Sequence, residues 1–412
     1  MSGGRQFFQI PGTFAMRRGG SLERPTVAYE TWGELNADRD NAVLIFTGLS
    51  PSAHAASSVL DPAPGWWEEI VGPSRPLDTR RFFVICVNSL GSCFGSTGAA
   101  STDPRTGEPY RLSFPELSLE DVAVAGHRLL EHLRIDRLRA LVGPSMGGMT
   151  ALGFAALYPG KARELLLISC GARSLPFATA LRSLQREMIR RDPGWNGGNY
   201  PPGGGPAAGM QLARKLGMIT YRSAPEWEQR FGRQRVAAER QGGDPFAPDF
   251  EIEGYLEAHA RKFAGQFDPN CYLDLSRASD LFDLADYGGS VQAGLRRIRA
   301  ERALVIGVAT DLLFPIHQQR ELAAGLRQGC GSVSFEELPS IQGHDSFLVD
   351  MERFGPVIRR FFASTGKDAL EEAVSRSCVP APRSHPRPGA FAPPGPLTGH
   401  GSGAPPCPLS GR

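Results

Sequence analysis

The sequence predicts an α/β protein, with a mostly parallel sheet covered by helices on both faces and interrupted by an inserted helical lid domain. Short apolar runs typical of buried strands alternate with helical stretches along much of the chain. Between about residues 171 and 300 the pattern changes, and helical stretches dominate between Gly- and Pro-rich loops. Apolar runs resume near residue 303, so the sheet is expected to continue after the insertion.

The expected elements follow in order along the chain. Strands are predicted at residues 26–31, 42–46, 82–87, 165–169, 303–308 and 334–338, with another leading into Gly143. Helices are predicted at residues 119–133 and 149–158 and, within the helical lid, at residues 177–190, 225–238 and 252–267. These elements divide the chain into a core (residues 1–170 and 301–366), the helical lid (171–300) and a Pro-, Gly- and Ser-rich tail (367–412), which we expect to be disordered.

Composition argues for an ordinary cytoplasmic enzyme. The 412 residues carry a net charge of +2, which gives no reason to expect a nucleic-acid partner. No stretch approaches the roughly 18–20 consecutive apolar residues of a membrane span, and the first residues lack the apolar centre of a secretory signal. Seven cysteines, with Cys86 and Cys170 in or beside apolar runs, favour reduced thiols. No Cys/His cluster has the spacing of metal ligands, so no metal is expected.

A Gly-x-Ser-x-Gly motif lies between an apolar run and helix-forming sequence, with Ser145 between Gly143 and Gly147. Strand, sharp turn and helix in that order are the context in which α/β-hydrolases carry a nucleophilic serine. The glycines would let strand and helix approach closely, and the N–H of Met146 would lie at a helix N-terminus that favours an anion. A chance match is the alternative in a chain with 49 glycines, so the partners of Ser145 must decide.

Those partners follow in the order Ser, Asp, His that is typical of this fold. Asp311 comes directly after the apolar run at residues 303–308, and His344 follows the expected last strand. His344 would deprotonate Ser145, and Asp311 would hold the tautomer of His344. Each alone could be a turn or surface residue, but three residues in this order at strand ends favour a catalytic triad.

With these motifs in place, the chain resembles the homoserine and serine O-acyltransferases of the α/β-hydrolase superfamily. The resemblance runs from about residue 7 to residue 363 and leaves out the tail. The matching segments are residues 27–36 (VAYETWGELN), 88–98 (NSLGSCFGSTG), 143–149 (GPSMGGM), 192–198 (DPGWNGG), 213–223 (ARKLGMITYRS), 262–263 (KF), 267–272 (FDPNCY), 311–315 (DLLFP) and 343–345 (GHD).

The resemblance implies an enzyme that acylates an amino-acid hydroxyl from acyl-CoA, with no permanently bound cofactor. It places the triad on Ser145, Asp311 and His344 and implies substrate binding by Arg214 and Asp345. One cation and one anion suit the carboxylate and ammonium of a free amino acid. The alternatives are a salt bridge within the helical lid for Arg214 and a loop cap for Asp345. The family also implies small-molecule partners (acyl-CoA with L-serine or L-homoserine) and a possible homodimer.

The turn at residues 47–54 should supply the second oxyanion donor, the backbone N–H of Leu49, beside that of Met146. A simple surface turn is the alternative. Its Leu-Ser-Pro-Ser-Ala-His sequence departs from the shorter Gly-Asp-x-His segment of the homoserine acetyltransferases and resembles the serine O-succinyltransferase branch. We expect His54 to be a structural or rim residue and not a second base.

Three arginines, Arg182, Arg186 and Arg190, share one face of a predicted helix in the lid. A solvated basic face is expected for Arg182 and Arg190. The resemblance brings Arg186 near the acyl pocket, where it could pair with the free carboxylate of a succinyl group.

The sequence therefore predicts a ping-pong acyltransferase that moves a succinyl group from succinyl-CoA to L-serine, in cysteine biosynthesis. The first alternative is a homoserine O-acetyltransferase or O-succinyltransferase of methionine biosynthesis. An esterase would need no Arg214/Asp345 pair, and an inactive binding scaffold would be expected to lack a member of the triad.

Overall fold

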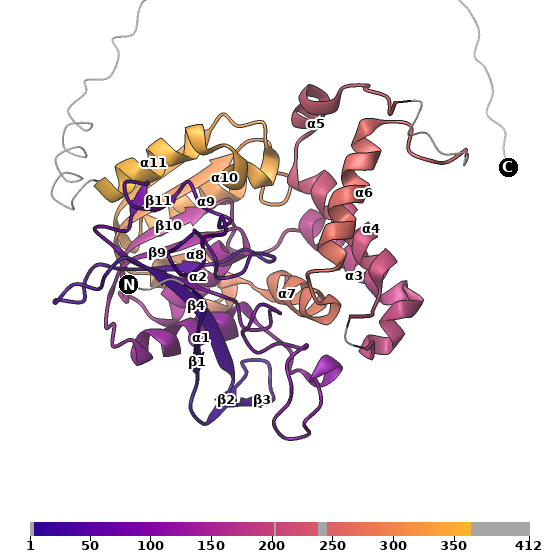
Figure 1. Ribbon diagram of the computed structural model, residues 1–412. Helices are drawn as coiled ribbons and strands as arrows, with labels where there is room; N and C mark the ends of the chain where they lie inside the picture. Colours follow the sequence, from indigo (N-terminus) through magenta and orange to yellow (C-terminus); the bar gives the residue numbers. More distant parts are fainter. Residues whose placement is uncertain (1–3, 202, 238–244, 364–412) are drawn as a thin grey trace, which may run out of the picture. The chain divides into compact units, whose positions relative to one another are not determined.

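The centre of the computed structural model, which describes residues 4–201, 203–237 and 245–363, is an eight-stranded sheet (Figure 1). Its strands, in spatial order, are β1 (Gln6–Gln9), β4 (Thr26–Trp32), β8 (Phe83–Val87), β5 (Ala42–Phe46), β9 (Leu138–Pro144), β10 (Ala162–Ile168), β11 (Ala300–Val308) and β12 (Cys330–Leu338). The six strands from β8 to β12 are parallel, and β4 lies antiparallel between β1 and β8. This arrangement confirms the mostly parallel sheet. Four short strands pair outside it: β2 (Thr13–Ala15) with β3 (Ser21–Glu23), and β6 (Val71–Gly72) with β7 (Leu77–Asp78).

The two faces of the sheet belong to separate apolar clusters, as alternate residues of β5 show. Leu44 and Phe46 pack in one cluster with residues of α1 (Leu119–His132), α2 (Met146–Leu157), α8 (Val291–Arg297) and α9 (Ile316–Leu326). Val43 and Ile45 pack in the other, with residues of α10 (Ser346–Val349) and α11 (Met351–Ala363). Because strand side chains alternate between faces, a strand buried on both sides is apolar throughout, as β5 is.

Helix α1 begins where the sequence indicates, because Ser118 and Asp121 form a capping box. The Asp121 N–H donates to the Ser118 hydroxyl at 3.1 Å, and the Asp121 carboxylate accepts from the Ser118 N–H at 2.8 Å. Two N–H groups that the first turn leaves unpaired are satisfied in this way.

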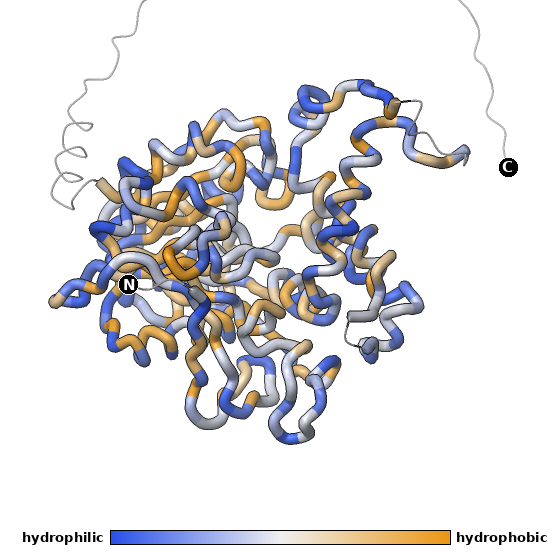
Figure 2. The backbone as a smooth tube through the Cα atoms, viewed as in Figure 1, coloured by the Kyte–Doolittle hydropathy of each residue, from blue (hydrophilic) through white to orange (hydrophobic). Residues whose placement is uncertain are grey.

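Between β10 and β11 the chain forms the helices of the lid. They are α3 (Pro176–Arg191), α4 (Ala207–Tyr221), α5 (Ala224–Phe231), α6 (Glu251–Ala264) and α7 (Pro269–Leu281); α8, in the same interval, packs in the apolar cluster on the sheet. In Figure 1, α3, α4, α5 and α6 gather to one side of the sheet, and in Figure 2 their residues alternate between hydrophilic and hydrophobic. Arg173 and Asp283, at the two ends of this insertion, form an antiparallel bridge.

The helices predicted for the lid need correction at one helix end, and some helices were missed. Helix α5 ends at Phe231, short of residue 238, because Gly232 takes a positive φ of 50° and its N–H bonds back to the carbonyl of Glu228. Helices α4, α7 and α8 were not predicted, and the start of α4 follows the Gly- and Pro-rich loop at residues 201–206. Residue 238 and the tail at residues 367–412 lie outside the described residues. Within the described ranges, no helix is long and apolar enough to cross a membrane.

Candidate active site

Ser145 occupies a strained turn between β9 and α2. Its backbone has φ 56° and ψ −126°, which a residue with a side chain rarely adopts. A Cβ on Gly143 would lie 2.2 Å from the carbonyl oxygen of Gly147, and one on Gly147 would lie 2.1 Å from that of Phe46. Both glycines are therefore required by close backbone contact, as the motif predicts, and Ser145 is held at the end of the parallel strands.

The structure brings the three residues of the predicted triad together. The Nε2 atom of His344 lies 2.7 Å from Oγ of Ser145, and its Nδ1 atom lies 2.8 Å from Oδ2 of Asp311. The other oxygen of Asp311 accepts from the N–H groups of Leu313 and Phe314, both at 2.9 Å. Asp311 is thus fixed by its own loop before it orients the histidine.

The electrostatics of His344 suit a base that becomes charged during reaction. Burial lowers its pKa, but the charge of Asp311 and the hydrogen bond to it outweigh burial, so the pKa of His344 lies above its ordinary value. At a pH above that pKa the ring is neutral and can accept the Ser145 proton. The Asp311 carboxylate then stabilises the imidazolium that forms.

The helical lid contacts the histidine loop directly. Gly343 has φ 68°, and a Cβ there would lie 2.7 Å from the carbonyl oxygen of Tyr221. The Ser223 hydroxyl donates to the carbonyl of Ile341 in the same loop. The end of α4 is thus fixed against the base, so the lid and the catalytic histidine are positioned together.

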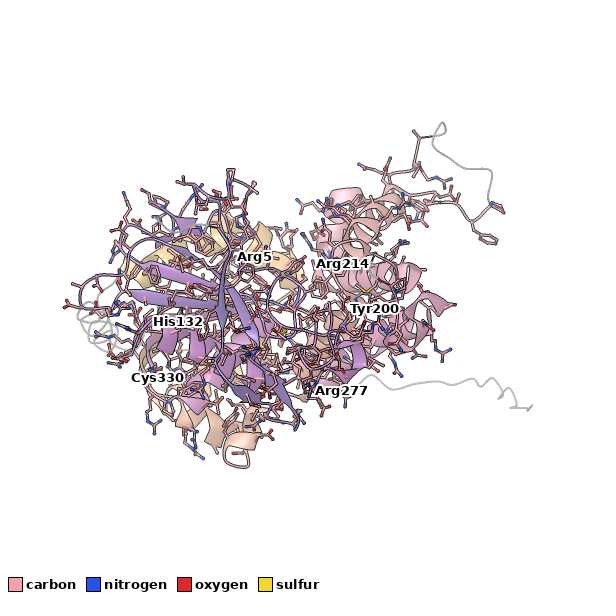
Figure 3. The ribbon with its side chains drawn as sticks, turned by 60° about the horizontal axis from the view of Figure 1, so that its bottom comes forward. Arg5, His132, Tyr200, Arg214, Arg277 and Cys330 are labelled. Atoms are coloured by element: carbon pink, nitrogen blue, oxygen red, sulfur yellow. The ribbon has the colours of Figure 1, made fainter. Side chains whose placement is uncertain are left out.

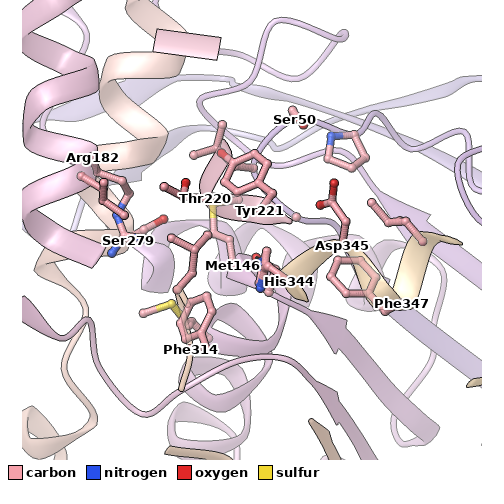
Figure 4. Close-up of a pocket in the computed structure, with 18 of the residues that line it drawn as sticks. Ser50, Met146, Arg182, Thr220, Tyr221, Ser279, Phe314, His344, Asp345 and Phe347 are labelled. Carbon is pink, nitrogen blue, oxygen red and sulfur yellow. Dashed lines mark hydrogen bonds between the residues drawn. The ribbon is translucent and has the colours of Figure 1, made fainter. Parts of the chain in front are cut away.

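A pocket opens over these residues (Figure 4). Its walls come from the turn at residues 47–54, the nucleophile turn, the helical lid and the histidine loop; among its lining residues are Gly48, Leu49, Ser50, Pro51, Trp66, Ser145, Met146, Arg182, Gln185, Tyr221, Tyr272, His344, Asp345 and Phe347. Figure 4 shows Arg182 and Ser279 towards one end, Asp345 and Phe347 towards the other, and His344 between.

Leu49 and Met146, the predicted oxyanion donors, lie in the same pocket as Ser145. Met146 begins α2, and the first N–H groups of a helix have no acceptor within that helix. Their donation to an oxyanion stays a prediction.

Asp345 lines the pocket beside the base. Its Oδ2 lies 3.2 Å from Nε of Arg222, and Nη1 of the same arginine donates to Oε1 of Gln342 at 2.9 Å. Burial raises the pKa of Asp345, while the charges of Arg222, His344 and Arg214 oppose that rise. A carboxylate held in this way can receive a cationic group from the pocket.

Arg214 lies on α4, in the helical lid (Figure 3), behind the residues that line the pocket. Its guanidinium lies over the ring of Phe263, 4.6 Å from the centroid, and 5.9 Å from that of Tyr221. Its buried Nε has no hydrogen-bond partner in the described part of the chain. The lid salt bridge that was the alternative for Arg214 is not seen among the described residues.

The expectation for Arg182 is wrong. This side chain is buried, with 8% of the residue exposed, and it lines the pocket. Its Nε lies 2.6 Å from Oδ1 of Asp280 and its Nη2 2.6 Å from the Ser174 hydroxyl. Helical spacing placed Arg182 on a face but could not show that α7, nearly a hundred residues later, covers it.

Arg186 follows Arg182 by one helical turn on α3. Its Nη2 is 2.7 Å from the second oxygen of Asp280, and it is absent from the pocket lining. The contacts therefore place Arg182, and not Arg186, at the wall that a substrate would meet. Arg190 is exposed, as expected.

Comparisons with known proteins show the family to which the chain belongs. A family model described as the alpha/beta hydrolase fold matches residues 41–350. A protein named serine O-succinyltransferase, from Litchfieldella anticariensis, is 57% identical over 364 residues, which cover 88% of this chain and 99% of the relative. The chain belongs to the homoserine/serine O-acyltransferase family of the α/β-hydrolase superfamily.

Two more comparisons place this acyltransferase among its relatives. An L-serine/homoserine O-acetyltransferase from Streptomyces lavendulae is 58% identical over 362 residues, covering 87% of this chain and 97% of the relative. The crystal structure of a homoserine O-acetyltransferase from Bacillus anthracis matches with a TM-score of 0.79 at 27% identity, covering 88% of this chain and 98% of that one. The family and the α/β-hydrolase fold predicted from the sequence are confirmed.

Proposed function

We propose that this acyltransferase moves a succinyl group from succinyl-CoA to the hydroxyl of L-serine, by way of an acyl ester on Ser145. The observation that carries the proposal is a hydrogen-bonded Ser145–His344–Asp311 relay in a pocket with a buried arginine towards one end and an aspartate towards the other. The names of the relatives support serine as acceptor and succinyl as the acyl group.

In the first half-reaction, Ser145 is acylated. Nε2 of His344 takes the hydroxyl proton as Oγ of Ser145 attacks the thioester carbonyl carbon. The N–H groups of Met146 and Leu49 donate to the resulting oxyanion, and in serine hydrolases one such donor is worth about 2.7–4 kcal/mol. Collapse breaks the C–S bond, His344 returns its proton to the CoA sulfur, and the acyl ester remains on Ser145.

In the second half-reaction, the amino acid removes the acyl group. Its hydroxyl gives its proton to Nε2 of His344 and attacks the ester carbonyl, and the departing Oγ of Ser145 takes that proton back. Asp345 would accept the substrate ammonium from within the pocket. Arg214 lies behind the lining residues, but its buried Nε is unpaired among the described residues, and it would bind the substrate carboxylate as the resemblance implies. The helical lid, fixed against the histidine loop, would limit water and so favour transfer over hydrolysis.

The donor end of the pocket carries a net positive charge. Arg182 and Arg186 share the single carboxylate of Asp280, and the exposed fractions of the three side chains are only 10%, 17% and 8%. Two buried cations against one anion leave about one positive charge uncompensated at the wall that Arg182 forms. A free carboxylate on the acyl group would neutralise it, and an acetyl group has none.

Replacing Arg182 with methionine, which keeps an unbranched stem but removes the guanidinium and its charge, should therefore reduce kcat/KM for succinyl-CoA and leave acetyl-CoA turnover nearly unchanged. Loss of a charged hydrogen bond costs about 1.5–3 kcal/mol, or roughly 10- to 100-fold. Thiol release with each donor measures this. Arg186→Met is the matched comparison: if it causes the larger donor-selective loss, Arg186 is the recognition residue, as the resemblance implies.

Asp345→Asn and Arg214→Met should impair the acceptor half-reaction with either donor. Each removes one charge complementary to a free amino acid, so we expect kcat/KM for serine to fall by about 10- to 100-fold. The burst of thiol released without acceptor should keep its rate, because acylation of Ser145 does not use the amino acid. A slowed burst would contradict the assignment and place the residue in donor binding or in the fold.

One panel assay tests the proposed function as a whole. The purified protein is supplied with succinyl- or acetyl-CoA and with serine or homoserine, and thiol release and the acylated product are measured. Preference for acetyl-CoA and homoserine would replace the proposal by the homoserine acetyltransferase alternative. Ester cleavage without transfer to any amino acid would favour an esterase. The expected roles in cysteine biosynthesis, in the cytoplasm and as a homodimer stay predictions.

A further inference from the structure

His54, at the end of the turn at residues 47–54, has an oxygen acceptor at each of its ring nitrogens. Nε2 lies 2.8 Å from the carbonyl oxygen of Ala63, and Nδ1 lies 2.8 Å from Oε2 of Glu30. A carbonyl oxygen can only accept, so Nε2 must carry a hydrogen. The contact with Glu30 then needs a second proton, either on Nδ1 or on the carboxyl group. The pair therefore holds one proton more than a neutral histidine beside a carboxylate.

This proton lies in a buried and acidic setting. Glu30, in β4, has 1% of its side chain exposed, and His54 has 13%. Oδ2 of Asp61 lies 3.6 Å from Nδ1 of His54. Cys86, in β8, is the residue that pairs with Glu30 across the two strands, so its thiol adds a second titratable group. Burial lowers the pKa of His54, but its hydrogen bonds and the charges of Glu30 and Asp61 raise it overall.

His54 connects three segments around one wall of the pocket. Its own turn supplies residues 48–51 of the lining, including Leu49. Its side chain ties that turn to β4 through Glu30 and to the following loop through Ala63. The backbone carbonyl of His54 accepts from the backbone N–H of Trp66. Trp66 lines the pocket, and its indole N–H donates to the Ser52 carbonyl at 3.0 Å.

We propose that His54 is a positioning residue for acyl transfer, and that the proton it shares with Glu30 fixes the turn so that the N–H of Leu49 can donate to the oxyanion formed at Ser145. This inference rests on the oxyanion role given to Leu49 in the proposed function. Loss of the shared proton leaves the Nδ1 lone pair facing a carboxylate at hydrogen-bond distance. Repulsion would then open the contact and loosen the turn.

The sign of the pH effect follows from the raised pKa of His54. A group with a higher pKa in the folded state contributes stability below its unfolded pKa and loses it as pH rises through the folded pKa. The rate of Ser145 acylation should therefore decline on the alkaline side as the clamp between His54 and Glu30 is lost. Neutral His344 is retained at such pH, so the triad itself does not predict this decline.

Glu30→Gln gives the sharpest test. The glutamine amide can donate to Nδ1 of a neutral His54 while Nε2–H still donates to Ala63, so both hydrogen bonds persist without a titrating proton. We expect this variant to acylate at close to the wild-type rate at neutral pH but to lose the alkaline decline. His54→Ala and Glu30→Leu should lower the maximal burst rate by about tenfold, with little change in the ester concentration that gives half of that rate. This loss is less than the roughly 100- to 1000-fold cost of removing an oxyanion donor.

The readout is the burst of nitrophenol from p-nitrophenyl acetate, with Ser145→Ala as the background. This ester acylates the serine without CoA or an amino acid, so the result judges His54 even if succinyl-CoA proves not to be the donor. His317→Gln, at an exposed position on α9, is the matched histidine control. An unchanged alkaline decline in Glu30→Gln would overturn the proposal, and so would a wild-type burst rate in a folded His54→Ala. If His54→Ala does not fold, the pH profile of Glu30→Gln decides alone.

Discussion

Replacing Ser145 with alanine is expected to abolish acyl transfer while leaving the fold intact. The hydroxyl makes the 2.7 Å contact with His344 and would form the acyl ester, and no other side chain is placed to replace it in the relay described above. In a well-studied serine protease, loss of the nucleophile costs on the order of 10⁶-fold in kcat. Thermal unfolding should change little, because only one partly accessible hydrogen bond is lost.

Intact-mass spectrometry gives the direct measurement for Ser145. Wild-type protein mixed with succinyl-CoA and no acceptor should gain the mass of one succinyl group, and Ser145→Ala should gain none. An adduct that persists in the variant would place the nucleophile on another residue. Reversal by added serine, with release of the acylated amino acid, would identify the ester as an intermediate.

Asp311→Asn should give the second largest loss, about 10⁴-fold in kcat by analogy with the same change in a serine protease. The N–H groups of Leu313 and Phe314 would hold the asparagine oxygen, so its amide would face His344. An amide donor at Nδ1 forces the ring hydrogen onto Nε2, which then points at Ser145 and cannot accept its proton. The variant should fold normally, because its volume and its hydrogen-bond positions are kept.

Steady-state kcat with succinyl-CoA and serine measures this prediction, and Asp286→Asn, at a half-exposed carboxylate outside the pocket lining, is the control. A loss of less than tenfold for Asp311→Asn would show that His344 is oriented by some other group. An equal loss in the control would point to a general effect on the fold.

The catalytic residues were the most predictable part of the molecule because their signals are local. Gly143 and Gly147 are required by backbone contacts within a few residues or with the adjacent strand. Asp311 follows an apolar strand, and His344 follows the last strand of the sheet. The edges of parallel strands then bring the three together. Most of the sheet was predictable for the same reason, since strands such as β5 are apolar throughout, whereas the edge strand β1, with half-buried and exposed residues, was not predicted.

The substrate-facing residues were less predictable because distant segments decide their environment. Arg182 has the spacing of a solvated face, but Asp280 on α7 turns it into a buried pocket residue. His54 follows a turn that indicates only a rim position, and its partner Glu30 lies in a strand where an apolar residue would be expected. Helix α4, which carries Arg214, follows a Gly- and Pro-rich loop that hides its beginning.

The bridge between Arg173 and Asp283 brings the start and the end of the lid helices together beside the sheet. A segment whose two ends already meet can be exchanged without stretching the framework that receives it. The triad belongs to that framework, whereas Arg182 and its partner Asp280 both lie within the exchangeable segment. Donor preference could therefore change during evolution by replacement of one cassette, provided that the new segment keeps the contacts of Tyr221 and Ser223 with the histidine loop. The same boundary offers a place to graft the corresponding segment of an acetyl-specific relative and so to move donor choice as a unit.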